Sequence, residues 1–155
     1  MVAFDTSPAA LAMVVLTGIA SGIVPFVNAE VYVVALGSMA PRPLLPLLLV
    51  IATLSHMVGK ALLYWAGHAA ERLPEGRFTR RLAAARAKFD ERTTLGGALV
   101  FVSASVGLPP FYVLTVACGV LGYSFRWFFV LGFAGRLLRF GALILVPELS
   151  RQLMR

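Results

Sequence analysis

Long apolar stretches alternate with short polar or breaker-rich segments along this chain, and the apolar stretches come in two sizes. The short ones cover residues 9–24, 26–40, 93–106 and 111–125, and the long ones cover residues 44–70 and 125–146. A perpendicular membrane span needs about 20 residues, so only the long stretches can each cross a bilayer alone. The pattern predicts an all-α integral membrane protein in which a pair of short helices precedes each full span.

Glycine and proline residues separate the two members of each short pair. The first break contains Gly22 and Pro25, and the second contains Gly107, Pro109 and Pro110. Because these residues weaken a helix, neither stretch is expected to remain helical. Non-helical backbone at bilayer depth persists only where protein buries it or where it lines a wet cavity. Each pair is therefore predicted to form a re-entrant hairpin, with two short, tilted spans as the alternative.

Local signals set two further boundaries. Ser7 followed by Pro8 is typical of a helix start, with serine as the cap and proline at the first helical position. Pro147, followed by Glu148, is predicted to end the last span.

The order of hairpin and span occurs twice in a single predicted membrane domain, residues 1–155. The first copy covers residues 8–70 and the second covers residues 93–146, with a connector at 71–92 and a tail at 147–155. A hairpin begins and ends on one side of the membrane, whereas a span crosses once. The two halves would then enter from opposite sides, as in the inverted-topology repeats of secondary transporters. A bundle of four spans would give the same parity.

Composition supports a membrane protein. Of the 155 residues, 59% are hydrophobic and 14% are charged, which is too apolar for a soluble domain of this size. The connector, residues 71–92, holds seven basic and four acidic residues, an excess of three positive charges in a chain whose net charge is +7. This excess predicts a cytoplasmic connector, with both chain termini on the far side. Phe78, Leu82, Ala85 and Phe89 recur at helical spacing, which predicts an amphipathic helix on the membrane surface. A basic cytoplasmic loop is the alternative. The basic excess gives no support to nucleic-acid binding.

Several functional classes are not expected. Asp5 and the lack of a basic start argue against a cleaved signal peptide. The single cysteine, Cys118, excludes an internal disulfide and any multi-cysteine metal site. Neither a hydrolase triad, a phosphate-binding loop nor a cluster of metal ligands occurs in the sequence, so we expect no enzyme activity, metal or cofactor.

A few polar residues interrupt the apolar stretches and are the candidates for function. Glu30 is the only acidic or basic residue between Thr6 and Pro41, and it follows the first break. A carboxylate at bilayer depth costs a few kcal/mol or more unless it is paired, hydrated or protonated. We predict a transport or proton-coupling role for Glu30, Asn28, His56 and Lys60. The alternatives are a packed His56 and a structural Glu30 that either accepts hydrogen bonds from backbone N–H groups of the opposite hairpin or pairs with Lys60 or Arg139.

Two arginines lie in the middle of the last span. Arg136 and Arg139 are three positions apart and therefore share one helix face. Each costs about 2.5–3.5 kcal/mol to insert at that depth. Together with Lys60 they are predicted to bind a lipid phosphate, because guanidinium forks match phosphate oxygens. The alternative is a clamp between helices.

Several residues match a known membrane protein family in their order and spacing. They are Pro25, Asn28-Ala29-Glu30, Gly59, Tyr64, Gly67, Pro109-Pro110, Cys118-Gly119 in place of an Ala-Gly turn, and Gly135-Arg136-Leu137-Leu138-Arg139-Phe140. On these residues the chain resembles the DedA/VTT superfamily (SNARE-associated Golgi protein-like), most closely its small YqaA-like branch, over nearly its whole length.

The resemblance implies two facing re-entrant hairpins inside a helical bundle of the bacterial inner membrane. Family members with an assigned role move undecaprenyl phosphate or phospholipids, in some cases using the proton gradient. A lipid transporter or scramblase for an anionic phospholipid or polyprenyl phosphate is therefore expected, with Glu30 as the proton-coupling residue. A homo-oligomer is compatible with this expectation. The alternative is a non-transporting scaffold whose buried polar residues only stabilise the bundle.

The chain departs from the larger family members at three positions. Those members carry arginines where this chain has Ser105 and Phe111, and often an acid where it has Lys60. Lys60, Arg136 or Arg139 would have to supply the phosphate contacts instead.

Overall fold

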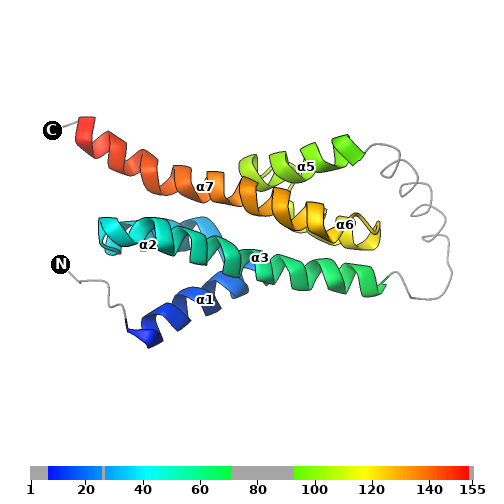
Figure 1. Cartoon of the computed structure of the whole chain (residues 1–155), viewed down its shortest axis with the longest axis horizontal. Helices are drawn as coiled ribbons and strands as arrows, with labels where there is room; N and C mark the ends of the chain where they lie inside the picture. Colours follow the sequence, from blue (N-terminus) through cyan, green and yellow to red (C-terminus); the bar gives the residue numbers. More distant parts are fainter. Residues whose placement is uncertain (1–6, 26, 71–92, 154–155) are drawn as a thin grey trace. The chain divides into compact units, whose positions relative to one another are not determined.

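A computed structural model describes residues 7–25, 27–70 and 93–153, and Figure 1 shows its helices. In chain order they are α1 (Pro8–Ile23), α2 (Ala29–Met39), the 3₁₀ helix η1 (Arg42–Leu44), α3 (Leu45–Ala70), α5 (Thr93–Val106), α6 (Phe111–Val120) and α7 (Phe125–Leu153). Helices and the loops that join them account for all of these residues, which confirms the all-α prediction for this part of the chain. The amphipathic helix predicted for the connector lies outside the described residues.

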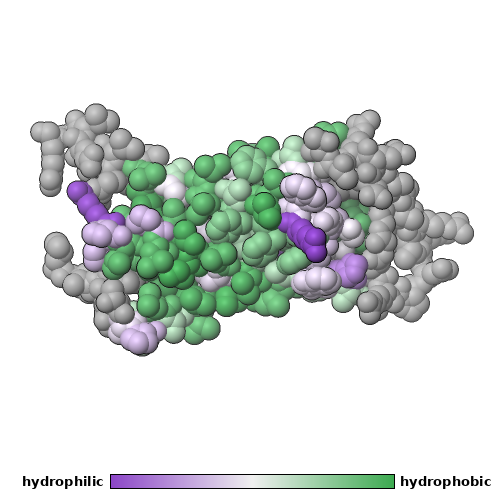
Figure 2. Space-filling model, in the orientation of Figure 1, coloured by the Kyte–Doolittle hydropathy of each residue, from purple (hydrophilic) through white to green (hydrophobic). Residues whose placement is uncertain are grey.

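Two of the described helices are long and apolar enough to cross a membrane. The stretches are Arg42–Ala69, with 28 residues, and Phe125–Leu145, with 21 residues. Both meet the length of about 20 residues that a bilayer requires, as the sequence predicted. Large hydrophobic side chains are exposed on both, including Leu62 and Val130. Figure 2 shows hydrophobic residues over most of the visible surface that is not grey. Such a surface is suited to contact with lipid.

The first short pair is broken close to the predicted position. α1 starts as expected, because Ser7 Oγ accepts a hydrogen bond from the amide of Ala10 and Pro8 occupies the first turn. The helix ends at Ile23, and Pro25 lies in the non-helical stretch before α2. Gly22, which was expected in the break, instead belongs to the last turn of α1. The break therefore begins after Ile23, and Gly22 packs against Gly59 of α3.

The second short pair is broken where the sequence predicted. α5 ends at Val106, residues 107–110 are non-helical, and α6 begins at Phe111. Gly107 has a φ of 91°, a left-handed conformation that favours glycine.

The second helix of this pair is shorter than predicted. It ends at Val120 rather than at residue 125, and Gly122, with a φ of 68°, lies in the turn before α7. Cys118 and Gly119 therefore belong to α6 and not to a turn. Gly119 is required there because a side-chain carbon would collide with the carbonyl oxygen of Tyr64.

The last span also differs from its prediction at one end. α7 continues through Pro147 to Leu153 instead of ending at residue 146. A proline removes only one backbone hydrogen bond from a helix, so a helix can continue beyond it.

The structure divides into two compact units. The first, which we call the terminal unit, comprises residues 1–59 and 136–155, and the middle unit comprises residues 60–135. The boundaries fall inside α3 and α7, so each long helix contributes one half to each unit. Every unit therefore contains one pair of short helices and two half-helices.

The terminal unit is held together by a close helix crossing and a small hydrophobic core. A side-chain carbon added to Gly22 on α1 would lie 2.9 Å from the Cα atom of Gly59 on α3. Such small-residue contacts are common between membrane helices because they let two backbones approach. In the core, the buried Phe140 of α7 packs against Ala29 and Val33 of α2.

The close crossing leads to a stability prediction. Gly22→Ala should lower the free energy of unfolding by about 1–3 kcal/mol, because the added methyl group has no space against backbone atoms. Gly141→Ala is the matched control in the same unit, since its added carbon would be 3.7 Å from Leu49 Cδ2, an ordinary contact. Thermal unfolding of the purified variants in detergent measures both. Equal stability of the two variants would contradict the crossing.

Candidate functional site

An ion pair connects the start of α2 to α7 within the terminal unit. Arg139 Nε donates a hydrogen bond of 2.8 Å to Glu30 Oε1, and its Nη2 donates to the same oxygen. The Arg139 side chain is 24% exposed and that of Glu30 is 39% exposed. The sequence left Lys60 and Arg139 open as partners of Glu30, and the structure selects Arg139.

Asn28 holds Glu30 in place by capping the helix. Its side-chain oxygen accepts hydrogen bonds from the amides of Glu30, at 2.9 Å, and Val31, at 3.4 Å. A carboxylate in the first turn also interacts favourably with the positive end of the helix dipole. Asn28, a predicted transport residue, is therefore positioned as the cap of α2.

Arg136 lies one turn before Phe140 on the same helix face as Arg139. Its guanidinium carbon is 5.8 Å from the centre of the Phe140 ring, a cation–π distance. Glu30 carries the single carboxylate among the side chains that the structure describes. One carboxylate cannot neutralise two guanidinium groups, so the described part of this cluster keeps a net positive charge.

His56 is buried and also contacts the Phe140 ring. Its ring meets the Phe140 ring edge-on, with centres 5.5 Å apart, and its Nδ1 is 2.9 Å from Ser21 Oγ. Ser21 donates its only proton to the Gly18 carbonyl at 2.7 Å, so His56 Nδ1 must be the donor to Ser21. The histidine thus ties α3 to the last turn of α1, immediately before the first break.

Lys60 occupies the middle unit and is only 3% exposed. Its ammonium nitrogen is 5.9 Å from the ring centre of Phe111 and 5.3 Å from that of Tyr112. These two residues open α6, directly after the second break. These aromatic rings are the contacts of the Lys60 ammonium group that the structure describes.

The second break is itself held by a side-chain hydrogen bond. Ser103 on α5 donates its hydroxyl proton to the carbonyl oxygen of Pro109. This break, with Gly107, Pro109 and Pro110, directly precedes Phe111 and Tyr112, whose rings lie near Lys60. Ser105 donates a hydrogen bond to the carbonyl of Phe101 inside α5.

Sequence reasoning missed three contacts between helices. They are the hydrogen bond between Ser21 and His56, the packing of His56 on Phe140, and the hydrogen bond of 2.7 Å that Tyr32 donates to the Val14 carbonyl. Each depends on which helix faces which. Only the spacing of small residues at Gly18 and Gly22 could have indicated that α1 packs closely on another helix.

Comparison with known proteins gives no further assignment, because no family model, curated protein or solved structure matches this chain.

The ion pair can be tested with a double-mutant cycle. Glu30→Gln and Arg139→Gln should each destabilise the protein, because each leaves the other charge without its partner. The double variant should lose less than the sum, with a coupling of about 1 kcal/mol for a partly exposed pair. Thermal unfolding in detergent measures all four proteins, with the exposed Arg42→Gln as the control. Additive losses would contradict a direct interaction.

Proposed function

We propose that this chain is an integral membrane protein that moves an anionic lipid across the bilayer. The observation that carries the proposal is a buried or half-buried cationic side chain directly beside each helix break. Arg139 and Arg136 lie by the first break, and Lys60 lies by the second. Cations at bilayer depth are costly and usually mark a substrate or ion pathway.

The two units contain equivalent parts, which supports a repeat. Gly59 of α3 lies against α1, and Gly135 of α7 lies against α5, where an added carbon would be 2.7 Å from Ala104 Cβ. A cation follows each glycine directly: Lys60 in the first case and Arg136 in the second.

The second helix of each pair completes the equivalence. α2 packs on α7 through Val33 and Phe140, and α6 packs on α3, where an added carbon on Gly67 would be 2.7 Å from the Val116 carbonyl. In each pair, then, the first helix contacts the long helix that follows it, and the second contacts the other long helix. This arrangement favours two re-entrant hairpins in an inverted-topology repeat over a simple bundle of spans.

In the proposed mechanism the cations bind the lipid phosphate. A guanidinium group can donate two parallel hydrogen bonds to phosphate oxygens. Glu30 competes for Arg139, so uptake of a proton by Glu30 would release Arg139 toward the phosphate, and loss of the proton would restore the pair. Lys60, in the middle unit, offers a separate contact beside the rings of Phe111 and Tyr112. The substrate class is an anionic phospholipid or a polyprenyl phosphate.

The family assignment and the location belong to the same proposal. Membership of the DedA/VTT superfamily, a bacterial inner membrane and a cytoplasmic connector at residues 71–92 all agree with the apolar exterior and the distribution of basic residues.

A non-transporting scaffold is the second candidate, and the ion pair between Glu30 and Arg139 favours it. Two charges bound to each other at 2.8 Å could simply lock α2 onto α7. The two candidates differ in whether lipid moves.

The binding role of Arg136 can be tested with purified protein in liposomes that contain a fluorescent anionic lipid. Arg136→Gln should slow movement of this lipid by about ten-fold or more, because a charged hydrogen-bond donor is lost. Arg136→Lys should slow it less, since the charge remains and only the fork geometry is lost. Dithionite quenching of the fluorescent headgroup measures the rates, with Arg42→Gln as the control. Equal rates for wild type and both Arg136 variants would contradict a binding role.

The role of Glu30 requires a pH profile. Glu30→Gln retains size and hydrogen-bonding capacity but cannot titrate, so the folded variant should move lipid at a rate that no longer changes with pH. The scaffold alternative expects no lipid movement by any variant, and destabilisation as the only effect. If Glu30→Gln keeps both the wild-type rate and its dependence on pH, this carboxylate has no role in coupling.

A further inference from the structure

A large aromatic cluster in the middle unit is not used by the proposed transport mechanism. Tyr64 is buried at its centre, with its ring centre 5.2 Å from those of both Phe125 and Phe128, and its hydroxyl donates to the Tyr123 carbonyl. Trp65 packs on Phe125 with ring centres 5.5 Å apart. The cluster joins the last turns of α3 to the turn before α7 and to the first turn of α7.

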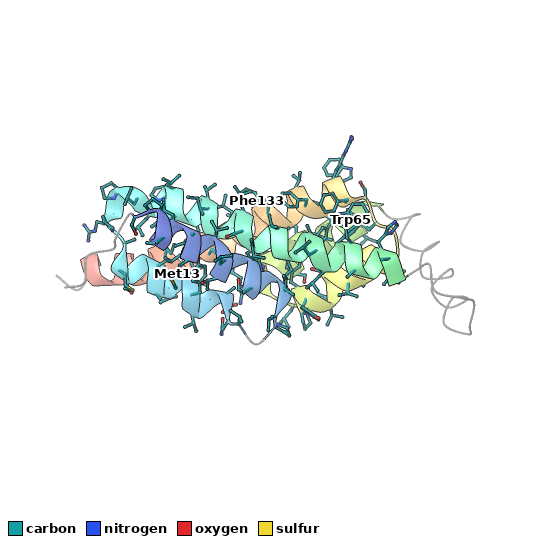
Figure 3. All side chains as sticks on the ribbon, turned by 90° about the horizontal axis from the view of Figure 1, so that it is seen from below. Met13, Trp65 and Phe133 are labelled. Atoms are coloured by element: carbon teal, nitrogen blue, oxygen red, sulfur yellow. The ribbon has the colours of Figure 1, made fainter. Side chains whose placement is uncertain are left out.

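The cluster reaches the surface at Trp65, which is 51% exposed and which Figure 3 shows on α3. Trp127, two residues after Phe125 in the first turn of α7, is 61% exposed. Arg126, between Phe125 and Trp127, is also exposed. His68 Nδ1 is 3.3 Å from the Gly119 carbonyl, which can only accept, so this nitrogen carries the proton. The last turns of α3 and the first turn of α7 meet through Trp65 and Phe125. We call the exposed residues of these turns, Trp65, Arg126 and Trp127, together with His68, the indole surface.

We propose that the indole surface lies in the headgroup layer of the bilayer and binds an anionic phospholipid there. Indole rings have an apolar body and a polar N–H group, which places tryptophan at membrane–water interfaces. Arg126 adds a guanidinium group at the same level, and such groups match lipid phosphate oxygens. This proposal rests on the membrane location in the proposed function, and not on lipid movement.

The charge balance favours an anionic lipid over a zwitterionic one. The described side chains of the middle unit carry Lys60 and Arg126 and no carboxylate. The connector that leaves α3 beside His68 adds seven basic against four acidic residues. Each basic side chain near a membrane surface strengthens binding to anionic lipids. A protein partner would instead be expected to cover the indoles and keep lipid away from them.

The two tryptophans of the chain both belong to this surface, so its lipid contacts can be followed by intrinsic fluorescence without labels. The protein would be reconstituted in phosphatidylcholine vesicles brominated at one shallow or one deep acyl position. Shallow bromines should quench the tryptophans more strongly than deep ones. Stronger quenching by deep bromines would overturn the headgroup location. Absence of quenching would do so as well and would indicate a protein-covered surface.

Lipid selectivity is tested by comparing brominated phosphatidylglycerol with brominated phosphatidylcholine at equal mole fraction. The anionic lipid should occupy sites beside the indoles about five-fold more tightly. Arg126→Gln should abolish most of this preference, Arg126→Lys should retain part of it, and Arg42→Gln in the terminal unit should leave it unchanged. Equal quenching by both lipids in the wild type would overturn the anionic site. Circular dichroism confirms that each variant is folded.

The outcome is separable from that of the transport proposal. A protein that moves lipid but shows no preference in quenching would overturn the indole surface alone. A protein that shows the preference but moves no lipid would overturn transport alone.

Discussion

The ion pair between Glu30 and Arg139 determines how α2 is attached to α7 within the terminal unit. It joins α2, directly after the first break, to a residue 109 positions later in the chain. Taking either charge out of water is favourable only if the other is present with good hydrogen-bond geometry. The pair therefore fixes where α2 begins and which face of α7 it meets. Phe140 follows Arg139 and packs against α2 as well. Its ring also contacts His56 and the guanidinium group of Arg136.

The fold could be predicted wherever a local signal decides it. Ser7 and Pro8 start a helix through their own chemistry, and Gly107 to Pro110 cannot continue one. The errors occurred where tertiary contacts decide. Gly22 was assigned to a break because glycine weakens helices, but the close approach of Gly59 requires it inside α1. Pro147 was expected to end α7, yet α7 continues to Leu153. The proline removes one backbone hydrogen bond, and the remaining ones keep the helix intact.

The site was predicted as a set of residues and not as an arrangement. Glu30, Lys60, Arg136 and Arg139 were identified because charges in apolar stretches are costly. Their partners could not be assigned, because periodicity does not determine which helix faces which. Hence Arg139 rather than Lys60 binds Glu30, while Lys60 lies over the rings of Phe111 and Tyr112. The described surroundings of the two cations therefore differ, with a carboxylate beside Arg139 and aromatic rings beside Lys60.

The central claim is that cations beside helix breaks serve an anionic lipid. The most direct measurement is the rate at which wild-type protein, reconstituted in liposomes, moves a fluorescent phosphatidylglycerol compared with a phosphatidylcholine carrying the same fluorophore. We expect the anionic lipid to move at a rate well above that in protein-free liposomes and faster than the zwitterionic lipid. Movement of neither lipid above the protein-free rate, or of both at one rate, would contradict it.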